Sequence, residues 1–353
     1  MRRPVLLRFG ALAAGAVLLP ALAACGTDEE NGGGDAAAEN GEGGTLTIYS
    51  GRNEELVGGI LDELEEATGR DVEVRYGDSA EMAAQLLEEG DATDADLFFS
   101  QDAGALGALS QQGMLAELPD EVLDVVPERF RAEDDTWAAT SARARVIAYN
   151  AELVDEAELP DNLDELVDER WRGEVGFAPT NASWQAFVTG LRVLEGDDGA
   201  RDWLMAFRDN EPEQFENNSS TLEGVDNGEV SLGLINHYYH HALVEERGED
   251  NVDVEIHYAE QDDPLALVNI AGVGILNSSD NQDAAEEAAA FLVSEDAQQY
   301  FADETAEYAV RDGVTSTVHD LPPIDELPSP DIDLSELAPL EETLEMLQDV
   351  GLS

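Results

Sequence analysis

Hydrophobic positions along the chain alternate between two patterns. Short apolar runs are typical of buried strands, and apolar residues three or four positions apart are typical of one helix face. The first pattern predicts strands over 46–50, 71–76, 95–100, 146–149, 174–178, 230–235, 252–258 and 265–275. The second predicts helices over 54–68, 81–89, 103–112, 163–171, 183–194, 199–208, 221–227, 284–293, 295–301 and 337–350. Strands that alternate with helices imply a parallel sheet covered on both faces.

Length and composition indicate two folded domains. The chain has 353 residues, and 43% of them are hydrophobic, which is enough for real cores. Segments 140–150 and 265–275 are suited to cross from one domain to the other. No internal repeat is seen.

The charge balance excludes some partners. There are 80 acidic residues against 17 basic ones, all of them Arg, and the formal net charge is −63. Such a surface repels nucleic acid and anionic membranes. Acidity without Lys suggests a halophilic protein kept soluble in strong brine, where salt screens the self-repulsion.

The N-terminus is typical of an export signal. Arg2, Arg3 and Arg8 precede an apolar segment, 11–24, that is too short to span a bilayer permanently. The sequence Leu-Ala-Ala-Cys ending at Cys25 resembles a bacterial lipobox, which implies cleavage after residue 24 and lipidation of Cys25. The alternative is a plain secretory signal with an incidental Cys.

The remainder of the N-terminal region adds a tether. Residues 26–44 are rich in Gly and acidic residues, and they predict a flexible linker behind the lipidated Cys25. Cys25 is the only cysteine, so no disulfide is expected. We therefore expect a signal peptide over 1–24, a lipidated tether over 25–44, and an extracytoplasmic protein that meets the membrane only through its lipid.

Two adjacent tyrosines give the clearest chemical signal. Tyr238 and Tyr239 follow the apolar strand 230–235, and ligand crevices in open α/β sheets lie beyond the carboxyl ends of strands. Phenolate oxygens suit a hard, highly charged cation such as ferric iron. The alternative is a pair of aromatic residues that cap a core. No nucleophile, phosphate-loop, dinucleotide or zinc motif is evident, so we do not expect an enzyme.

A ferric ion held by two phenolates keeps a positive charge and open positions, which attract a small anion. Asn181, Ala182 and Ser183 follow a strand and open a helix, and Asn218 precedes another helix, so both places could bind an anion or simply cap the helices. Arg143 and Arg145 share one face of a strand, where they could bind an anion or form structural ion pairs.

Several short stretches, taken together, resemble the bacterial ferric-binding proteins, the extracytoplasmic solute receptors of ABC iron importers. The resemblance runs from about residue 45 to the C-terminus. The matching stretches are 46–52, 95–100, 141–146, 171–173 with 179–180, 225–229, 234–239, and 263–264 with 266–268.

This resemblance implies a two-lobed α/β fold of the type II periplasmic-binding-protein kind. Its sheets are parallel-rich with helices on both faces, and crossing strands join the lobes. The lobes are expected at 45–143 plus 270–318 and at 144–269 plus 319–353. The resemblance also implies Tyr238 and Tyr239 as iron ligands, with a synergistic carbonate or phosphate held near Asn181 to Ser183, Asn218 and Asn236.

Four positions depart from the family pattern. Asn53 stands where many relatives have a ligand His, Glu54 where some have a Tyr, Gln101 where some have a ligand Glu, and Trp184 where some have a third Tyr. We therefore expect either a site dominated by the anion and two tyrosines, or recruitment of Glu54 as a third ligand. Glu54 has the alternative of a residue that only stabilises the first turn of a helix.

The resulting expectation is a monomeric lipoprotein that captures ferric ion with an anion and passes it to an ABC permease and its ATPase subunit. The alternative is a receptor of the same fold for an oxyanion, a phosphonate or another small organic solute, without a metal.

Overall fold

The computed structural model describes residues 44–260 and 262–353. The predicted signal peptide, Cys25 and nearly all of the tether lie outside the described residues. Within the described part, no helix is long and apolar enough to cross a membrane.

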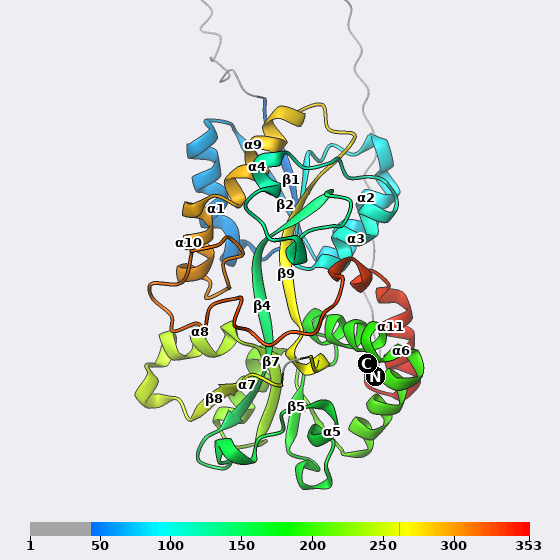
Figure 1. The fold of residues 1–353 in the computed structure, drawn as a ribbon, viewed down its shortest axis with the longest axis vertical. Helices are drawn as coiled ribbons and strands as arrows, with labels where there is room; N and C mark the ends of the chain where they lie inside the picture. Colours follow the sequence, from blue (N-terminus) through cyan, green and yellow to red (C-terminus); the bar gives the residue numbers. More distant parts are fainter. Residues whose placement is uncertain (1–43, 261) are drawn as a thin grey trace, which may run out of the picture. The chain divides into compact units, whose positions relative to one another are not determined.

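One curled sheet runs through the molecule (Figure 1). Its strand order is β2-β1-β3-β9-β4-β7-β5-β6, with β8 paired to β4. The strands are β1 (Leu46–Ser50), β2 (Val72–Tyr76), β3 (Leu97–Ser100), β4 (Trp137–Asn150), β5 (Val175–Phe177), β6 (Glu213–Gln214), β7 (Leu232–Asn236), β8 (Val254–His257) and β9 (Val268–Ile275).

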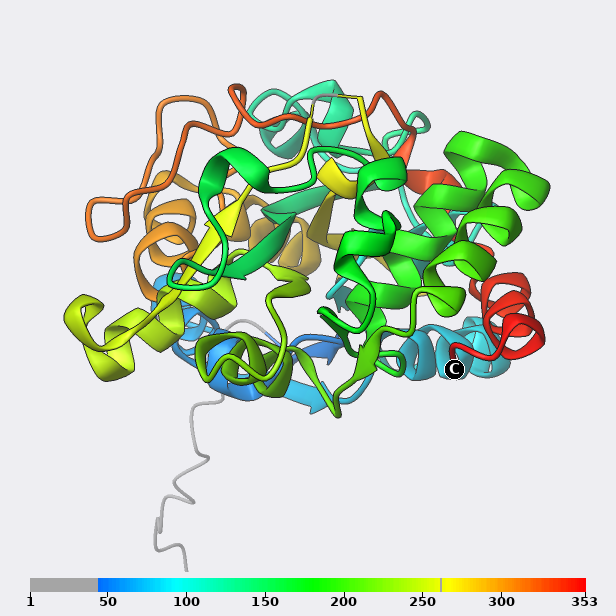
Figure 2. The same cartoon turned by 90° about the horizontal axis from the view of Figure 1, so that it is seen from below.

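Helices cover both faces of the sheet, as the alternating pattern predicted (Figures 1 and 2). They are α1 (Glu54–Thr68), α2 (Ser79–Glu89), α3 (Ala103–Gln111), α4 (Asp120–Leu123), α5 (Leu163–Leu166), α6 (Ala182–Asp209), α7 (Asn218–Asp226), α8 (Tyr238–Arg247), α9 (Gln282–Leu292), α10 (Glu295–Glu304) and α11 (Leu340–Val350).

Two long strands connect the upper and lower halves in Figure 1. In β4, residues 137–144 pair with β9, and residues 145–150 pair with β7 and β8. Both crossing strands run antiparallel to their neighbours, whereas β1 is parallel to β2 and β3, and β5 is parallel to β6 and β7. The sheet thus has the parallel pairing that the family resemblance implied, and it is antiparallel at the crossing, because a chain that returns between two halves must reverse direction there. Where the lobes begin and end stays a prediction.

An aromatic core holds the lower half together. Trp184, Phe187, Trp203 and Phe207 pack against one another, and all are buried. Helix α11 lies along α6 in both views, while the short 3₁₀ helix at Leu334–Leu337 packs against α3 (Figures 1 and 2). The C-terminal segment therefore contacts both halves.

Local sequence explains most helix ends. Asn53 caps α1 by accepting a hydrogen bond from the Glu55 N–H, and Gly69 ends α1 in the left-handed conformation, as predicted. Helix α6 contains a break at Gly196, with φ 74° and ψ 165°, which agrees with two predicted helices over 183–194 and 199–208. The helix α8 was not predicted.

Candidate functional site

Three helices begin at the same edge of the lower sheet. The parallel strands β7, β5 and β6 are neighbours, and they are followed by α8, α6 and α7 respectively. Parallel strands place their carboxyl ends together, so the N-termini of these helices converge. Each helix N-terminus carries a partial positive charge, and α8 has no side-chain cap, so the edge favours negative ligand atoms.

Tyr238 and Tyr239 form the first turn of α8, and their side chains lie together. Their ring centroids are 4.5 Å apart, and both residues are partly exposed. Burial and the neighbouring Tyr239 raise the pKa of Tyr238, while Arg143 and a hydrogen bond with Asn236 act in the opposite direction. The phenol is therefore neutral in the metal-free protein, and a bound cation would have to displace its proton.

Asn181, Ser183 and Asn218 meet in one polar cluster. Asn181 Oδ1 accepts hydrogen bonds from the Ser183 backbone N–H at 2.9 Å and from its hydroxyl at 2.7 Å. Asn218, which is 1% exposed at the start of α7, donates from Nδ2 to Ser183 Oγ at 2.9 Å. The structure thus brings together three of the predicted anion-binding residues, and Asn236, also buried, contacts Tyr238.

Arg145 is a buried cation with no carboxylate partner among the described residues. Its NH1 donates to the Ser183 carbonyl at 3.3 Å, and its guanidinium lies over the Phe187 ring at 4.7 Å. Nε and NH2 are buried and have no hydrogen-bond partner within residues 44–260 and 262–353. Burial lowers the pKa of Arg145 to about 9. These unsatisfied donors are what an anion would satisfy.

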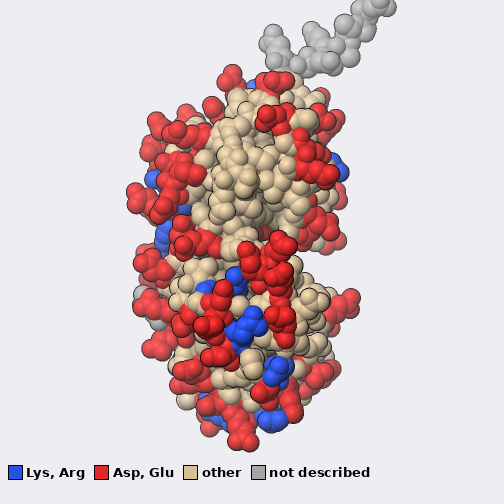
Figure 3. Space-filling view, turned by 90° about the vertical axis from the view of Figure 1, so that its right-hand side faces the viewer, with Lys and Arg blue, Asp and Glu red and all other residues tan. Residues whose placement is uncertain are grey.

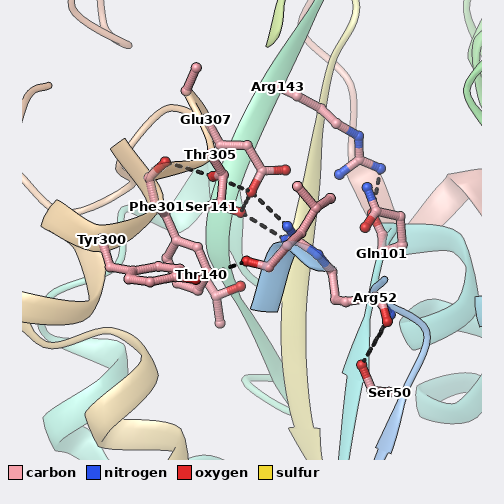
Figure 4. Close-up of polar contacts among 12 residues, drawn as sticks. Ser50, Arg52, Gln101, Thr140, Ser141, Arg143, Tyr300, Phe301, Thr305 and Glu307 are labelled. Carbon is pink, nitrogen blue, oxygen red and sulfur yellow. Dashed lines mark hydrogen bonds and ion pairs between the residues drawn. The ribbon is translucent and has the colours of Figure 1, made fainter. Parts of the chain in front are cut away.

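Arg143 is also buried, and it connects the two halves. It donates to the Gln101 backbone carbonyl in the upper half, and its NH1 has no partner (Figure 4). Burial lowers the pKa of Arg143, while the nearby Tyr238 and Glu307 oppose that shift. Neither Arg143 nor Arg145 forms an ion pair within 4.0 Å in the described part of the chain, so the structural ion-pair interpretation of both residues is wrong.

The positions that depart from the family pattern lie in different surroundings. Asn53 and Glu54 are exposed at the start of α1, and the Asn53 side chain serves as the helix cap. Gln101 is partly exposed, and its backbone contacts both Arg143 and Ser79. Trp184 is 1% exposed within the aromatic core, which differs from its expected cleft position, and its ring contacts the Arg145 guanidinium. Ala182 is exposed at the start of α6.

Two features of the site were not predicted from sequence. The helix α8 continues from the tyrosines, and a buried network joins Arg52, Ser141 and Glu307 (Figure 4). Arg52 stood in one of the stretches that carry the family resemblance, but nothing local pointed to Glu307. Among the described residues, no group of three His, Cys, Asp or Glu side chains could hold a metal ion.

The fold and this site define an extracytoplasmic solute-binding protein with two lobes. The family profile described as "Bacterial extracellular solute-binding protein" matches residues 92–333. The major ferric iron-binding protein of Neisseria meningitidis serogroup B is 31% identical over 310 residues, covering 87% of this chain and 93% of that protein.

Solved structures agree with this class. Iron-bound HitA from Pseudomonas aeruginosa superposes with a TM-score of 0.80 and 34% identity, covering 87% of this chain and 99% of that chain. The Trichodesmium protein IdiA (FutA), in complex with iron and citrate ligands, gives a TM-score of 0.76 and 25% identity, covering 88% and 100%. The chain belongs to the bacterial ferric-binding proteins of the extracellular solute-binding family. These relatives are binding proteins, so the prediction that the chain is not an enzyme is confirmed.

Proposed function

We propose that this chain captures ferric iron together with a synergistic anion and delivers it to an ABC importer. The observation that carries the proposal is the pairing of Tyr238 and Tyr239 at an edge where three helices begin. Arg143 lies near Tyr238, and the buried Arg145 has no carboxylate partner among the described residues. Phenolates supply negative oxygen to the metal, and the arginines and N–H groups supply positive charge to the anion.

Binding begins with loss of the phenol protons. Ferric iron would draw both protons away and coordinate Tyr238 and Tyr239, and Arg143 would compensate the phenolate charge. Glu54 is the proposed third protein ligand if the site recruits one, since it begins the helix that follows β1. Closure of the cleft between the lobes would then bury the ion.

The anion would complete the coordination of the metal. We propose carbonate or phosphate, bound by Arg145 together with Ser183 and Asn218 and the start of α6. We include Arg143, Asn181, Ala182 and Asn236 in this proposed anion site, since Asn181 contacts Ser183, and Asn236 pairs with Arg145 across the strands. The Trichodesmium relative was solved in complex with iron and citrate ligands, which supports an anion as part of the cargo.

Delivery follows from the family and from the N-terminus. We propose a monomeric lipoprotein anchored through Cys25 outside the cytoplasmic membrane, which docks on an ABC permease served by an ATPase subunit. The anchor is tested by growing bacteria that produce the wild type or Cys25→Ser with a radioactive fatty acid. The label on each purified protein is then measured. Equal labelling of both would contradict it.

Removing the phenols tests the central proposal. Ferric salt added with bicarbonate or phosphate should give a visible phenolate-to-iron charge-transfer band in the wild type. Tyr238→Phe or Tyr239→Phe should lose most of that band and weaken iron binding at least about tenfold, because each removes a charged ligand. Tyr149→Phe, which alters a tyrosine on β4 that pairs with Glu255 and with Leu232 at the far end of β7 from Tyr238, is the matched control and should keep the band. A wild type without band or bound iron would overturn the proposal.

A second candidate function is a receptor for an oxyanion, a phosphonate or another small organic solute without metal. Arg145 favours it, because this buried cation forms no ion pair and leaves two nitrogen atoms without a hydrogen-bond partner among the described residues. Calorimetry with phosphate and phosphonates, with and without ferric iron, separates the two functions. Tight binding of the anion that iron does not improve would favour the second.

A further inference from the structure

Glu307 is a buried carboxylate between segments that carry the candidate site residues. It lies just after α10 and is 1% exposed. Its Oε2 accepts from Arg52 NH2 at 2.8 Å and from the Ser141 hydroxyl at 2.9 Å, and Arg52 NH1 donates to the same Ser141 hydroxyl at 3.1 Å (Figure 4). Its Oε1 has no partner among the described residues. Figure 4 shows this free oxygen on the side of Arg143.

The segment around Glu307 contacts three stretches of the chain that carry site residues, namely the start of α1, the part of β4 before Arg143, and the turn before Tyr238. Through Glu307 it holds Arg52, which directly precedes Asn53 and Glu54. Through Tyr308 it pairs with Ala142, with two backbone hydrogen bonds of 2.8 Å, directly before Arg143.

The third contact reaches the tyrosine-bearing turn. His237 directly precedes Tyr238, is fully buried, and donates from Nε2 to the Ala306 carbonyl at 2.8 Å. Its ring stacks on Tyr308 at 4.5 Å between centroids. Ala306 has φ 52°, a left-handed conformation that non-glycine residues rarely adopt, so the packing of this segment is specific enough to hold a strained residue.

The charges in this cluster are unequal. Arg52 and Arg143 are both buried cations, and Glu307 is the carboxylate that ion-pairs with one and faces the other. Asp102 also acts on Arg143, but it caps α3 by accepting from the Ala105 N–H. If the charge of Glu307 were removed, Arg52 and Arg143 would remain as two neighbouring cations, of which Arg143 acts on Tyr238.

We propose that Glu307 is a positioning residue that sets the charge balance of the cleft, so that ferric ion and anion bind together in preference to the anion alone. The proposal rests on the proposed function for its iron part. It predicts effects of opposite sign on the two ligands, because a nearby positive charge disfavours a cation and favours an anion. Loss of a merely structural contact would weaken both.

The variant Glu307→Gln tests whether the effects on iron binding and on anion binding have opposite signs. Calorimetry should show ferric iron, supplied with phosphate, bound about tenfold more weakly than by the wild type, since one unit charge several ångströms away acts at an intermediate dielectric. Inorganic phosphate should bind to the metal-free variant several-fold more tightly. Arg52→Gln removes a positive charge and leaves Glu307 free to act on Arg143. It should therefore strengthen the binding of ferric iron and weaken the binding of phosphate. Glu287→Gln, which breaks the partly exposed pair with Arg70, is the matched control and should change neither.

A charge-balanced double variant separates charge from geometry. Arg52→Gln combined with Glu307→Gln removes both charges, and the ratio of the two affinities should return toward the wild-type value although the ion pair is lost. If the single variant Glu307→Gln fails to fold, the two affinities can still be measured on this double variant. Equal weakening of both ligands in Glu307→Gln, or no change in either, would overturn the inference. If the wild type binds no iron, the proposed function fails, while opposite shifts in phosphate affinity for the two single variants would still support the role of Glu307.

Discussion

Arg145 is a residue whose surroundings call for a bound anion. It is 3% exposed, two of its nitrogen atoms have no partner, and aromatic rings rather than carboxylates surround it. An unpaired buried cation costs free energy, so a protein that keeps one must gain from it in function. Stability and binding should therefore respond to Arg145 in opposite ways.

Arg145→Met should stabilise the anion-free protein against unfolding by on the order of 1 kcal/mol, because a side chain of similar volume replaces an unsatisfied charge. The same variant should bind phosphate at least about tenfold more weakly. Thermal unfolding and calorimetry measure the two effects. Arg192→Met is the control, because Arg192 in α6 pairs with Asp197 at 2.8 Å and donates to Thr343, so that variant should lose stability. A destabilised Arg145→Met with unchanged phosphate binding would contradict the assignment.

At the scale of elements, the end of α10 is stabilised by a loop that returns to it. Asp303 lies in the last turn, where a negative charge is unfavourable beside the helix C-terminus. It is retained because it accepts hydrogen bonds from Ser316, from the Thr317 N–H and hydroxyl, and from Gln299. Burial tends to raise the pKa of Asp303, but these hydrogen bonds outweigh it and lower the pKa. The carboxylate therefore joins α10 to the connector that leads to the C-terminal helix.

Asp303→Asn should lower the free energy of unfolding at neutral pH. A carboxyl whose pKa is depressed by folding stabilises the protein above its unfolded pKa of about 4, and that stabilisation disappears as the pH falls through the folded pKa. The stability difference between wild type and variant should thus be constant above about pH 5 and shrink in more acidic solution. Denaturant unfolding at several pH values measures it, and a difference that grows on acidification would contradict the interpretation.

The whole molecule is dominated by its negative charge. Figure 3 shows Asp and Glu along the edges of the displayed face, arginines mostly in the lower half, and a broad uncharged area in the upper half. With a net charge of −63, repulsion among carboxylates opposes the compact state wherever salt does not screen it. Our hypothesis is that this composition keeps the protein soluble in brine. It follows that the stability of the fold should depend on salt.

Raising KCl from about 0.05 M to about 2 M should raise the midpoint of thermal unfolding, because the screening length falls to a few ångströms. Sucrose at matched osmolality is the control, since it favours the compact state without screening charge. Equal midpoints at low and high KCl, or equal effects of KCl and sucrose, would argue against electrostatic repulsion as the cause.

Local sequence determined most of the elements. The strands before Asn53, Asn181 and Tyr238 and the cap at Asn53 follow from apolar spacing and side-chain chemistry within a few positions. The helix α8 was missed because it opens with aromatic residues and histidines, whose helix propensities are only intermediate, and lacks a cap side chain. The antiparallel crossing was missed because spacing along one chain says nothing about strand direction.

The sequence by itself determined which residues could act, namely two adjacent phenols, three amides ahead of helices, and two arginines on one strand face. Only the tertiary structure decided which of them meet. Arg145 reaches Ser183 across 38 positions and Glu307 reaches Arg52 across 255, and such contacts depend on how the whole chain packs. The same packing took Trp184 into the core and left Asn53 and Glu54 exposed, because burial is a property of the assembled fold and is not encoded at a single position.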